Sequence, residues 1–240
     1  MIVNNLSLKS VSVCMATYNG EKYIFEQLKS ILNSDKITEV IISDDGSTDK
    51  TKNIIESFKD KRIKIIEGPK KGLIKNFENS IKNATGKFIF LSDQDDVWLD
   101  NKVDIMLEKL CKYDLVCSDC FVTNKDLEVT TQSFFKLNKS KKGIFKNIVK
   151  NSYLGCCIGF NQKLVKDILP FPEKIGMHDW WIGLVAELKY STLFLEEKLI
   201  YFRRHSNTNS ITACESNFSI SRKIKWRLTI AYSLLKKILF

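Results

Sequence analysis

Short apolar runs alternate with amphipathic segments along the first part of the chain. β-prone runs occupy residues 11–16, 39–43, 62–67 and 87–92. Between them, apolar residues recur at helical spacing in residues 21–33, 48–58 and 72–84. Strands that alternate with helices form parallel sheets whose faces those helices cover. The pattern therefore predicts an α/β fold with a mostly parallel central sheet.

The alternation becomes less regular after residue 120. Residues 121–150 are polar and rich in lysine, and we interpret them as an excursion that leads to a short helix, not as a domain boundary. Strand-like runs then occupy residues 156–160, 191–196 and 198–205, and a helix is expected over residues 177–189. Residues 219–240 have apolar side chains at helical spacing and predict a basic amphipathic helix.

The composition is that of a globular protein that can bury a large core. The chain has 240 residues, of which 44% are hydrophobic and 28% charged, and this size fits one large domain or one domain with a smaller appendage. The net charge of +10 should attract nucleic acid, an anionic membrane surface or phosphorylated small molecules. The N-terminus has no secretion-signal pattern and no apolar run approaches the roughly 20 residues that span a bilayer, so we expect a cytoplasmic protein.

The seven cysteines do not form the pattern of a disulfide framework. Their number is odd, and the chain shows no secretion signal. Cys117 and Cys120 make a single CxxC within a strand-like run, and no second CxxC completes a zinc site. Small buried cysteines are the interpretation we favour, and redox or zinc chemistry is the alternative.

Three polar clusters follow predicted strands. They are ATYNG at residues 16–20, SDDGSTD at residues 43–49 and SDQDD at residues 92–96. Each one taken alone is typical of a solvated turn. Because ligands of open α/β sheets bind beyond the carboxyl ends of the strands, all three together predict a single site at that edge.

The SDQDD cluster suits a hard divalent cation. Mg²⁺ usually takes one or two carboxylates together with substrate phosphates, and a cation held there would neutralise a departing diphosphate. The chain has neither a Walker sequence nor GxGxxG, so a metal and basic side chains are the remaining means of holding phosphates. Arg203, Arg204 and His205 are candidates for the cationic side of the site, or else form a solvated basic strand end.

The sequence HDWW at residues 178–181 allows two interpretations. Asp179 could be a general base in a partly dry pocket, with Trp180 and Trp181 available to stack on a sugar ring. Alternatively, Asp179 caps a helix whose tryptophans belong to the core, which the residues alone favour.

These motifs together resemble those of the family 2 glycosyltransferases of GT-A fold. The resemblance rests on residues 11–32, 40–51, 86–98 and 177–181, in that order, and covers about residues 10–210. The sequences LSDQDDVW, MHDWW and FRRHSNTNS are similar to those of bacterial rhamnosyltransferase-type members. The resemblance implies a Rossmann-like sheet, a nucleotide-sugar half at about residues 10–120 and an acceptor half at about 121–218, with the basic helix of residues 219–240 following this domain.

The resemblance also implies roles for residues of the nucleotide-sugar half. Thr17, Tyr18 and Asn19 would line the nucleotide, and Asp44 would contact the nucleobase. The DXD motif falls on residues 93–95.

In that motif, Asp95 would bind Mn²⁺ or Mg²⁺ on the donor diphosphate. Asp93 would lie beside the ribose or the metal, and Asp96 would order the loop or approach the sugar. Arg204 and His205 are assigned to the nucleotide-sugar site.

The resemblance places the general base at Asp179, with Trp180 and Trp181 in the sugar or acceptor pocket. Many members have a Glu-Asp pair there, so the role of His178 stays open. The chain lacks the QxxRW sequence of processive members, which predicts transfer of one sugar per binding event. The implied reaction is an inverting transfer from a nucleotide sugar, with dTDP-rhamnose or a UDP-sugar as candidates, to a glycan or lipid-linked acceptor in surface polysaccharide synthesis.

Two alternatives concern the partners of the chain. The C-terminal helix either lies on an anionic membrane surface or packs on the domain with its lysines in solvent. The chain as a whole could instead be a non-catalytic polyanion-binding protein of the same fold. We expect no nucleic-acid partner, because known nucleic-acid motifs are missing and several acids gather at the predicted site.

Overall fold

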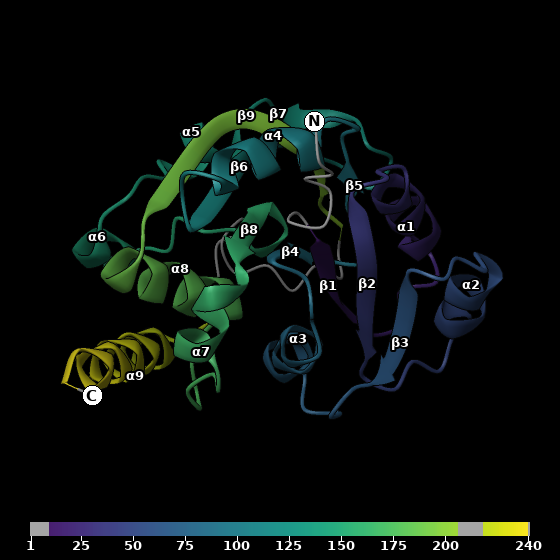
Figure 1. Ribbon diagram of the computed structural model, residues 1–240. Helices are drawn as coiled ribbons and strands as arrows, with labels where there is room; N and C mark the ends of the chain where they lie inside the picture. Colours follow the sequence, from purple (N-terminus) through teal and green to yellow (C-terminus); the bar gives the residue numbers. More distant parts are fainter. Residues whose placement is uncertain (1–9, 206–217, 240) are drawn as a thin grey trace, which may run out of the picture.

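A computed structural model describes residues 10–205 and 218–239 of the chain (Figure 1). The first half contains four parallel strands in the order β3-β2-β1-β4. Their bounds are β1 Val11–Thr17, β2 Ile37–Asp44, β3 Ile63–Glu67 and β4 Phe88–Ser92. The helices between them are α1 Ile24–Leu32, α2 Thr51–Ser57 and α3 Leu73–Lys82. Figure 1 shows α1 and α2 on one face of these strands and α3 on the other, as the alternating pattern predicted.

The second half extends the same sheet with strands of both directions. The order continues from β4 through β8 (Ile158–Asn161), β6 (Leu115–Thr123) and β9 (Thr192–Arg203) to β5 (Val97–Trp98). A further strand, β7 (Val129–Thr131), pairs with β6. Strand β8 is antiparallel to both its neighbours, whereas β9 is parallel to β6 and antiparallel to β5. The second half is therefore a mixed sheet that curls away from the parallel one.

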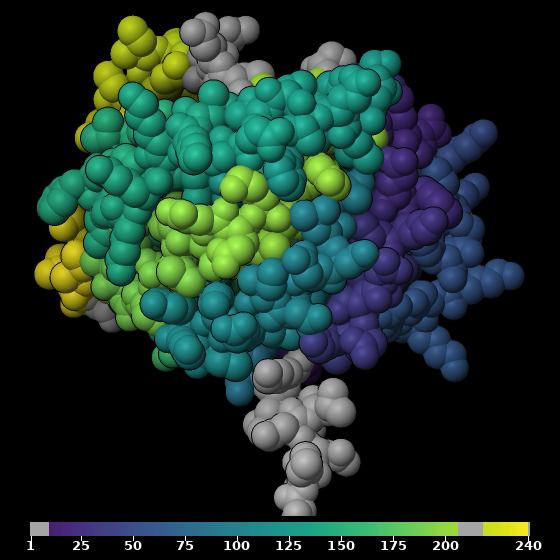
Figure 2. All heavy atoms as spheres, turned by 90° about the horizontal axis from the view of Figure 1, so that it is seen from above, coloured from purple at the N-terminus to yellow at the C-terminus, as the bar shows by residue number. Residues whose placement is uncertain are grey.

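Six α-helices of the described chain belong to the second half. They are α4 Lys102–Leu110, α5 Phe134–Asn138, α6 Ile144–Val149, α7 Val165–Ile168, α8 His178–Lys189 and α9 Ile220–Leu239. Short 3-10 turns lie at Gly155–Cys157 and Gln162–Leu164. In the space-filling view the first half, in purple and blue, occupies one side and the second half, in teal to yellow, the other (Figure 2).

The α/β prediction is confirmed, and the differences lie in the second half. Residues 191–196 and 198–205, expected as two strands, form the single strand β9 up to Arg203, with irregular register opposite β6 between Ser118 and Phe121. The run at 156–160 begins as a 3-10 turn and becomes a strand only at Ile158. The excursion at 121–150 holds one strand and two short helices.

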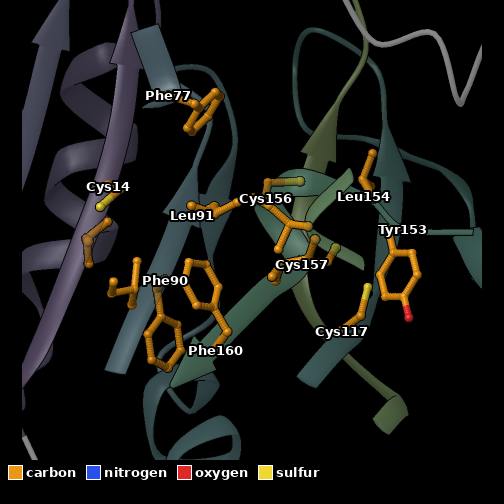
Figure 3. Packing of buried hydrophobic residues seen from close by; sticks show 14 of the residues in the cluster. Cys14, Phe77, Phe90, Leu91, Cys117, Tyr153, Leu154, Cys156, Cys157 and Phe160 are labelled. Carbon is orange, nitrogen blue, oxygen red and sulfur yellow. The ribbon is translucent and has the colours of Figure 1, made fainter. Parts of the chain in front are cut away.

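One hydrophobic core runs through both halves of the sheet. Phe90, Leu91 and Phe160 pack where β4 meets β8, and Cys117, Cys156 and Cys157 continue this core toward β6 (Figure 3). Cys14 and Cys120 are also buried, and Cys111 is exposed. No disulfide joins the described cysteines, and their burial agrees with the packing interpretation. Cys214 lies outside the described residues.

None of the described helices is both long enough and apolar enough to cross a bilayer.

Candidate active site

A cavity of about 440 Å³ opens at the carboxyl ends of β1 and β4, where the start of α8 meets them. Its wall contains Thr17, Tyr18, Asp93, Asp95 and Asp179 of the residues predicted for the site. The other predicted residues do not line it; they are Asn19, Asp44, Asp96, Trp180, Trp181, Arg204 and His205. The predicted edge of the sheet is therefore where the structure forms a cavity, although only part of the predicted set faces it.

Hydrogen bonds between side-chain amides and backbone groups hold the loop after β1 in place. Gln94 accepts from the Tyr18 N–H at 3.0 Å and donates to the Tyr18 carbonyl at 3.2 Å. Asn19 adopts a left-handed φ of 48°, which asparagine tolerates better than most residues. Its side-chain oxygen accepts from the Thr48 N–H at 2.9 Å. These contacts order the loop and leave the Tyr18 side chain exposed at the mouth of the cavity.

The two acids of DDGS have different surroundings. Asp44 is buried, and its carboxylate accepts hydrogen bonds from Ser47 at 2.6 Å and from Thr17 at 3.1 Å. Burial alone would raise its pKa, but the bonds from Ser47, Thr17 and Lys52 outweigh it and hold the pKa below the usual value. Asp44 thus keeps this loop in shape as an ionised group, and nucleobase contact by Asp44 stays a prediction.

Asp45 faces the cavity, and the sequence analysis did not single it out. Its carboxylate accepts from the backbone N–H groups of Lys70 at 2.6 Å and Gly72 at 2.8 Å. These bonds hold the loop after β3, and Lys70, Gly72 and Asn76 also line the cavity. That loop is a fourth polar cluster at the same edge of the sheet, with the sequence GPKKG at residues 68–72 as its signal.

Asp95 and His205 are far apart in the sequence and in contact in the structure. His205 Nε2 lies 2.9 Å from Asp95 Oδ2, and both side chains are largely but not completely buried. The His205 ring also packs on Tyr23, with 4.8 Å between the ring centroids. Carboxylate oxygen and imidazole nitrogen are ligands for divalent transition metals, and of the two residues Asp95 lines the cavity while His205 lies behind it.

Asp96 points away from the cavity into the protein. It is fully buried, and its Oδ1 accepts from the backbone N–H of Arg203 at 2.9 Å, which ties the DXD loop to the end of β9. Its Oδ2 has no hydrogen-bond partner among the described residues. Of the two roles expected for Asp96, ordering of the loop agrees with this placement, and approach to the sugar does not.

Asp93, Asp96 and Cys156 form a second group of metal-ligand types. One ligand atom from each lies within 4.8 Å of the others. Asp96 and Cys156 are both fully buried and neither lines the cavity, so an ion held by these two would not reach a diphosphate there. Of these three residues, Asp93 is the one that lines the cavity.

Asp179 is a buried carboxylate at the cavity wall. It lies in the first turn of α8, one residue inside the helix, and the N-cap position is Met177. Its oxygens accept from Trp180 N at 2.6 Å, Gly155 N at 3.1 Å and Asn151 Nδ2 at 3.3 Å. Burial nevertheless raises the pKa of Asp179 to about 7, because these bonds offset only part of the cost of desolvation.

Asp93 is a second carboxylate at the wall of the same cavity. Burial raises the pKa of Asp93 well above its usual value, and the negative charges of Asp95 and Asp179 raise it further. The carboxylates of the DXD loop and of α8 thus interact electrostatically across one cavity. Carboxyl groups whose pKa values are strongly perturbed in a cleft are typical of catalytic sites.

His178 is a neutral side chain beside Asp179. Its ring stacks on Phe77, with 3.9 Å between the ring centroids, and burial lowers its pKa to about 3. Neither ring nitrogen has a hydrogen-bond partner among the described residues. A β-carbon at Gly155 would lie 2.9 Å from His178 Nε2, so the glycine provides the room in which the ring lies.

Trp180 and Trp181 are part of the core. Both are buried, and their indole N–H groups donate to the carbonyls of Asn147 at 2.5 Å and Ile168 at 2.9 Å, respectively. The expectation that they line a sugar pocket does not agree with this packing. Each interpretation of HDWW therefore agrees with the structure in part. Asp179 lies at the cavity, as the first interpretation expected, and the two indoles lie in the core, as the second expected.

The basic residues after β9 also have different positions. Arg203 is buried and pairs with Glu26 at 2.5 Å, while its guanidinium lies 4.5 Å from the Tyr23 ring centroid. The backbone N–H of Arg204 donates to the Thr123 carbonyl at 2.9 Å. Lys70, from the loop after β3, is the lysine in the cavity wall. Arg203 thus stabilises the fold. The positive charge at the cavity wall comes partly from Lys70, which was not among the residues predicted from the sequence.

An α/β sheet with a cavity at its carboxyl edge, lined by carboxylates of perturbed pKa, has the architecture of a ligand-binding enzyme site. Comparison with known families identifies it more closely. The model of the family described as glycosyl transferase family 2 matches residues 12–169. The chain belongs to this family and is a glycosyltransferase.

Three similar proteins support this assignment. The dTDP-rhamnosyl transferase RfbG of Shigella flexneri is 29% identical over 88% of this chain and 77% of its own length. A UDP-Glc:alpha-D-GlcNAc-diphosphoundecaprenol beta-1,3-glucosyltransferase, WfgD of Escherichia coli, is 26% identical over 76% of this chain and 72% of its own. The crystal structure of S. aureus TarS in complex with UDP-GlcNAc superposes with a TM-score of 0.74 at 22% identity, over 94% of this chain and 66% of the solved one. The fold is GT-A, as expected.

Proposed function

We propose that the chain catalyses inverting, non-processive transfer of one sugar from a nucleotide sugar to a glycan or lipid-linked acceptor in bacterial surface polysaccharide synthesis. In this reaction an acceptor hydroxyl attacks the anomeric carbon, its proton passes to the protein, and the nucleoside diphosphate leaves. The cavity gathers carboxylates from the DXD loop and from α8 around a space where both substrates can meet.

The observation that carries this proposal is that Asp179 is a buried, oriented carboxylate whose pKa is raised. A general base works best when its pKa is near the working pH, and burial raises the pKa of Asp179 to about 7. Three donors, Trp180 N, Gly155 N and Asn151 Nδ2, hold the carboxylate in one orientation at the cavity wall. In our proposal Asp179 takes the proton of the acceptor hydroxyl.

Asp95, His205 and Asp93 are the residues that we propose hold Mn²⁺ or Mg²⁺. His205 Nε2 lies 2.9 Å from Asp95 Oδ2, so a nitrogen donor stands next to an oxygen donor of the wall, a set that suits Mn²⁺ better than the oxygen-preferring Mg²⁺. When bound, the ion would neutralise charge on the departing diphosphate. Lys70 adds a positive charge to the same wall.

The similar proteins suggest the classes of donor and acceptor. RfbG is named a dTDP-rhamnosyl transferase, and WfgD is named for a UDP-Glc donor and a diphosphoundecaprenol-linked acceptor. We propose dTDP-rhamnose or a UDP-sugar as donor and a lipid-linked saccharide as acceptor. The enzyme would then work in the cytoplasm, peripherally at the inner face of the membrane.

We further propose that residues 10–120 hold the nucleotide sugar and residues 121–218 hold the acceptor, with the helix of residues 219–240 at the membrane. Thr17, Tyr18 and Asn19 would position the nucleotide beside Asp44. The position of Asp179 and His178 at the start of α8, on the cavity wall, supports an acceptor site in the second half of the molecule.

Calorimetric titration with UDP-, dTDP- and GDP-sugars, each with and without Mn²⁺, tests the proposal. We expect one nucleotide class to bind, and Mn²⁺ to strengthen its binding. Absence of binding by every nucleotide sugar in the presence of Mn²⁺ would contradict the proposed donor site.

A further inference from the structure

The C-terminal helix α9 has three distinct faces. Trp226, Ile230 and Leu234 turn toward the domain, and the latter two are fully or almost fully buried. Arg222, Lys225 and Lys236 are exposed on a second face. A third face is apolar and exposed.

This third face is the apolar stripe that the sequence pattern places along the helix. Its members are between 49% and 77% exposed, and they are Ile220, Ile224, Leu228, Leu235 and Ile238. The helix thus packs on the domain through one set of apolar residues and leaves another set in solvent. A contiguous exposed apolar stripe on a soluble surface marks a site of interaction.

Helix α6 extends the exposed apolar surface. Phe145 and Val149 on α6 are 88% and 63% exposed. Arg227 of α9 donates from Nη2 to the Val149 carbonyl at 2.7 Å, which brings the end of α6 to the border of the exposed stripe. Figure 1 shows α6 and α9 on the side of the molecule opposite to α1 and α2. We call this combined area the α6–α9 surface.

The charge of this surface has one sign. Helix α9 carries six lysines and arginines and no acid, and residues 136–150 carry six lysines and no acid. Glu187 of α8 turns inward and accepts from Asn147 at 2.9 Å and Tyr153 at 2.8 Å. Exposed leucine, isoleucine and phenylalanine bordered by lysine and arginine fit a layer that is apolar inside and anionic at its surface.

We infer that the α6–α9 surface binds an anionic phospholipid bilayer, with the apolar stripe and Phe145 inserted among the lipid head groups. This inference deepens the proposed function, because a lipid-linked acceptor lies in the same layer. No described helix can cross a membrane, so the contact is with one face of the bilayer.

The bilayer contact is joined directly to the acceptor side of the cavity. Gly176, three residues before Asp179, lies between two aromatic rings. A β-carbon there would be 3.1 Å from ring atoms of Trp226 and 3.3 Å from the Trp180 ring. Trp226 of α9 therefore packs against the segment that leads into the proposed base, and binding of α9 to a bilayer places that end of the cavity close to the lipid.

Co-sedimentation of the full chain with vesicles tests the inference. One set of vesicles is phosphatidylcholine alone and the other contains phosphatidylglycerol in addition. We expect the wild-type chain to sediment with the anionic vesicles and to stay in solution with the neutral ones. The double variant Leu228→Asp/Leu235→Asp should bind the anionic vesicles at least about tenfold more weakly, because each buried leucine contributes about that much to a partition constant.

Phe25→Asp is the matched control, because Phe25 is also an exposed apolar residue and lies on α1 at the other side of the molecule. It should bind vesicles like the wild type. Thermal unfolding should show all variants folded. Equal binding of both vesicle types, or of the double variant and the wild type, would overturn the inference. So would a wild-type dimer in sedimentation velocity that Leu228→Asp/Leu235→Asp converts to a monomer, because the stripe would then be a self-interface.

Nucleotide-sugar binding, measured by calorimetry on the same variants, separates this inference from the proposed function. We expect it to be unchanged. If no nucleotide sugar binds while anionic vesicles still do, the proposed function fails and the α6–α9 surface remains.

Discussion

The two halves of the cavity wall are built differently. In the first half, Asp44, Asp45, Gln94 and Asn19 use their side chains to hold neighbouring loops, and Asp93 and Asp95 of the DXD loop line the wall. In the second half, Asp179 and His178 reach the cavity from the first turn of a buried helix, and burial shifts the pKa of each. We therefore expect the first half to hold the donor and its cation, and the second half to supply the base.

Replacement of Asp179 should have the largest effect. Asp179→Asn removes the proton acceptor and keeps the size of the side chain, so we expect turnover to fall by about 10²–10⁴-fold. Binding of the nucleotide sugar should stay within a few-fold of wild type, because the donor half is unchanged. The measurement is metal-dependent release of nucleoside diphosphate with lipid-diphosphate-linked acceptors, together with donor calorimetry. Wild-type turnover in Asp179→Asn would remove Asp179 as the base.

Loss of the cation site should come next. Asp95→Asn and His205→Gln each remove one proposed ligand, and we expect each to weaken Mn²⁺ binding at least about tenfold. Asp100→Asn is the matched control, since Asp100 is an exposed acid shortly after the same loop. Metal titration of turnover distinguishes the three variants. If His205→Gln leaves the Mn²⁺ dependence unchanged, His205 is not a ligand.

Asp45→Ala should have a smaller effect on the donor half. It removes the acceptor of two backbone N–H groups, those of Lys70 and Gly72, so we expect a loss of about 1–2 kcal/mol in the free energy of unfolding and several-fold weaker donor binding. Asp49→Ala removes similar bonds, from Thr51 and Glu21, on a residue that does not line the cavity. It should cost similar stability without weakening the donor. Equal donor binding in the two variants would show that Asp45 does not shape the site.

The first half of the molecule follows closely from its sequence. Strands β1 and β4 are buried on both faces, so continuous apolar runs mark them, and turn residues mark the edge where ligands bind. The cavity wall at Thr17, Tyr18, Asp93 and Asp95 could be located in this way. Asp45 could not be distinguished from Asp44, because the direction of each side chain depends on which loop packs on it.

The second half depends on long-range contacts that no local pattern reveals. Asp95 meets His205 across 110 residues, and Asp96 meets Arg203 across 107. The helical period of α9 shows that an apolar stripe exists, but only packing shows that a different face, with Trp226, Ile230 and Leu234, contacts the domain. For the same reason the sequence could not separate Asp179 at the cavity from Trp180 and Trp181 in the core.

The pH dependence of kcat/KM tests the central claim, that the second half supplies the base, most directly. Asp179 acts as a base only when ionised, and its pKa is raised to about 7. His178 stays neutral over this range because its pKa is lowered to about 3. We therefore predict that kcat/KM rises about tenfold per pH unit below pH 7 and levels off above it, with the same midpoint in wild type and Asp45→Ala. A flat profile between pH 5.5 and 8.5 would contradict the account.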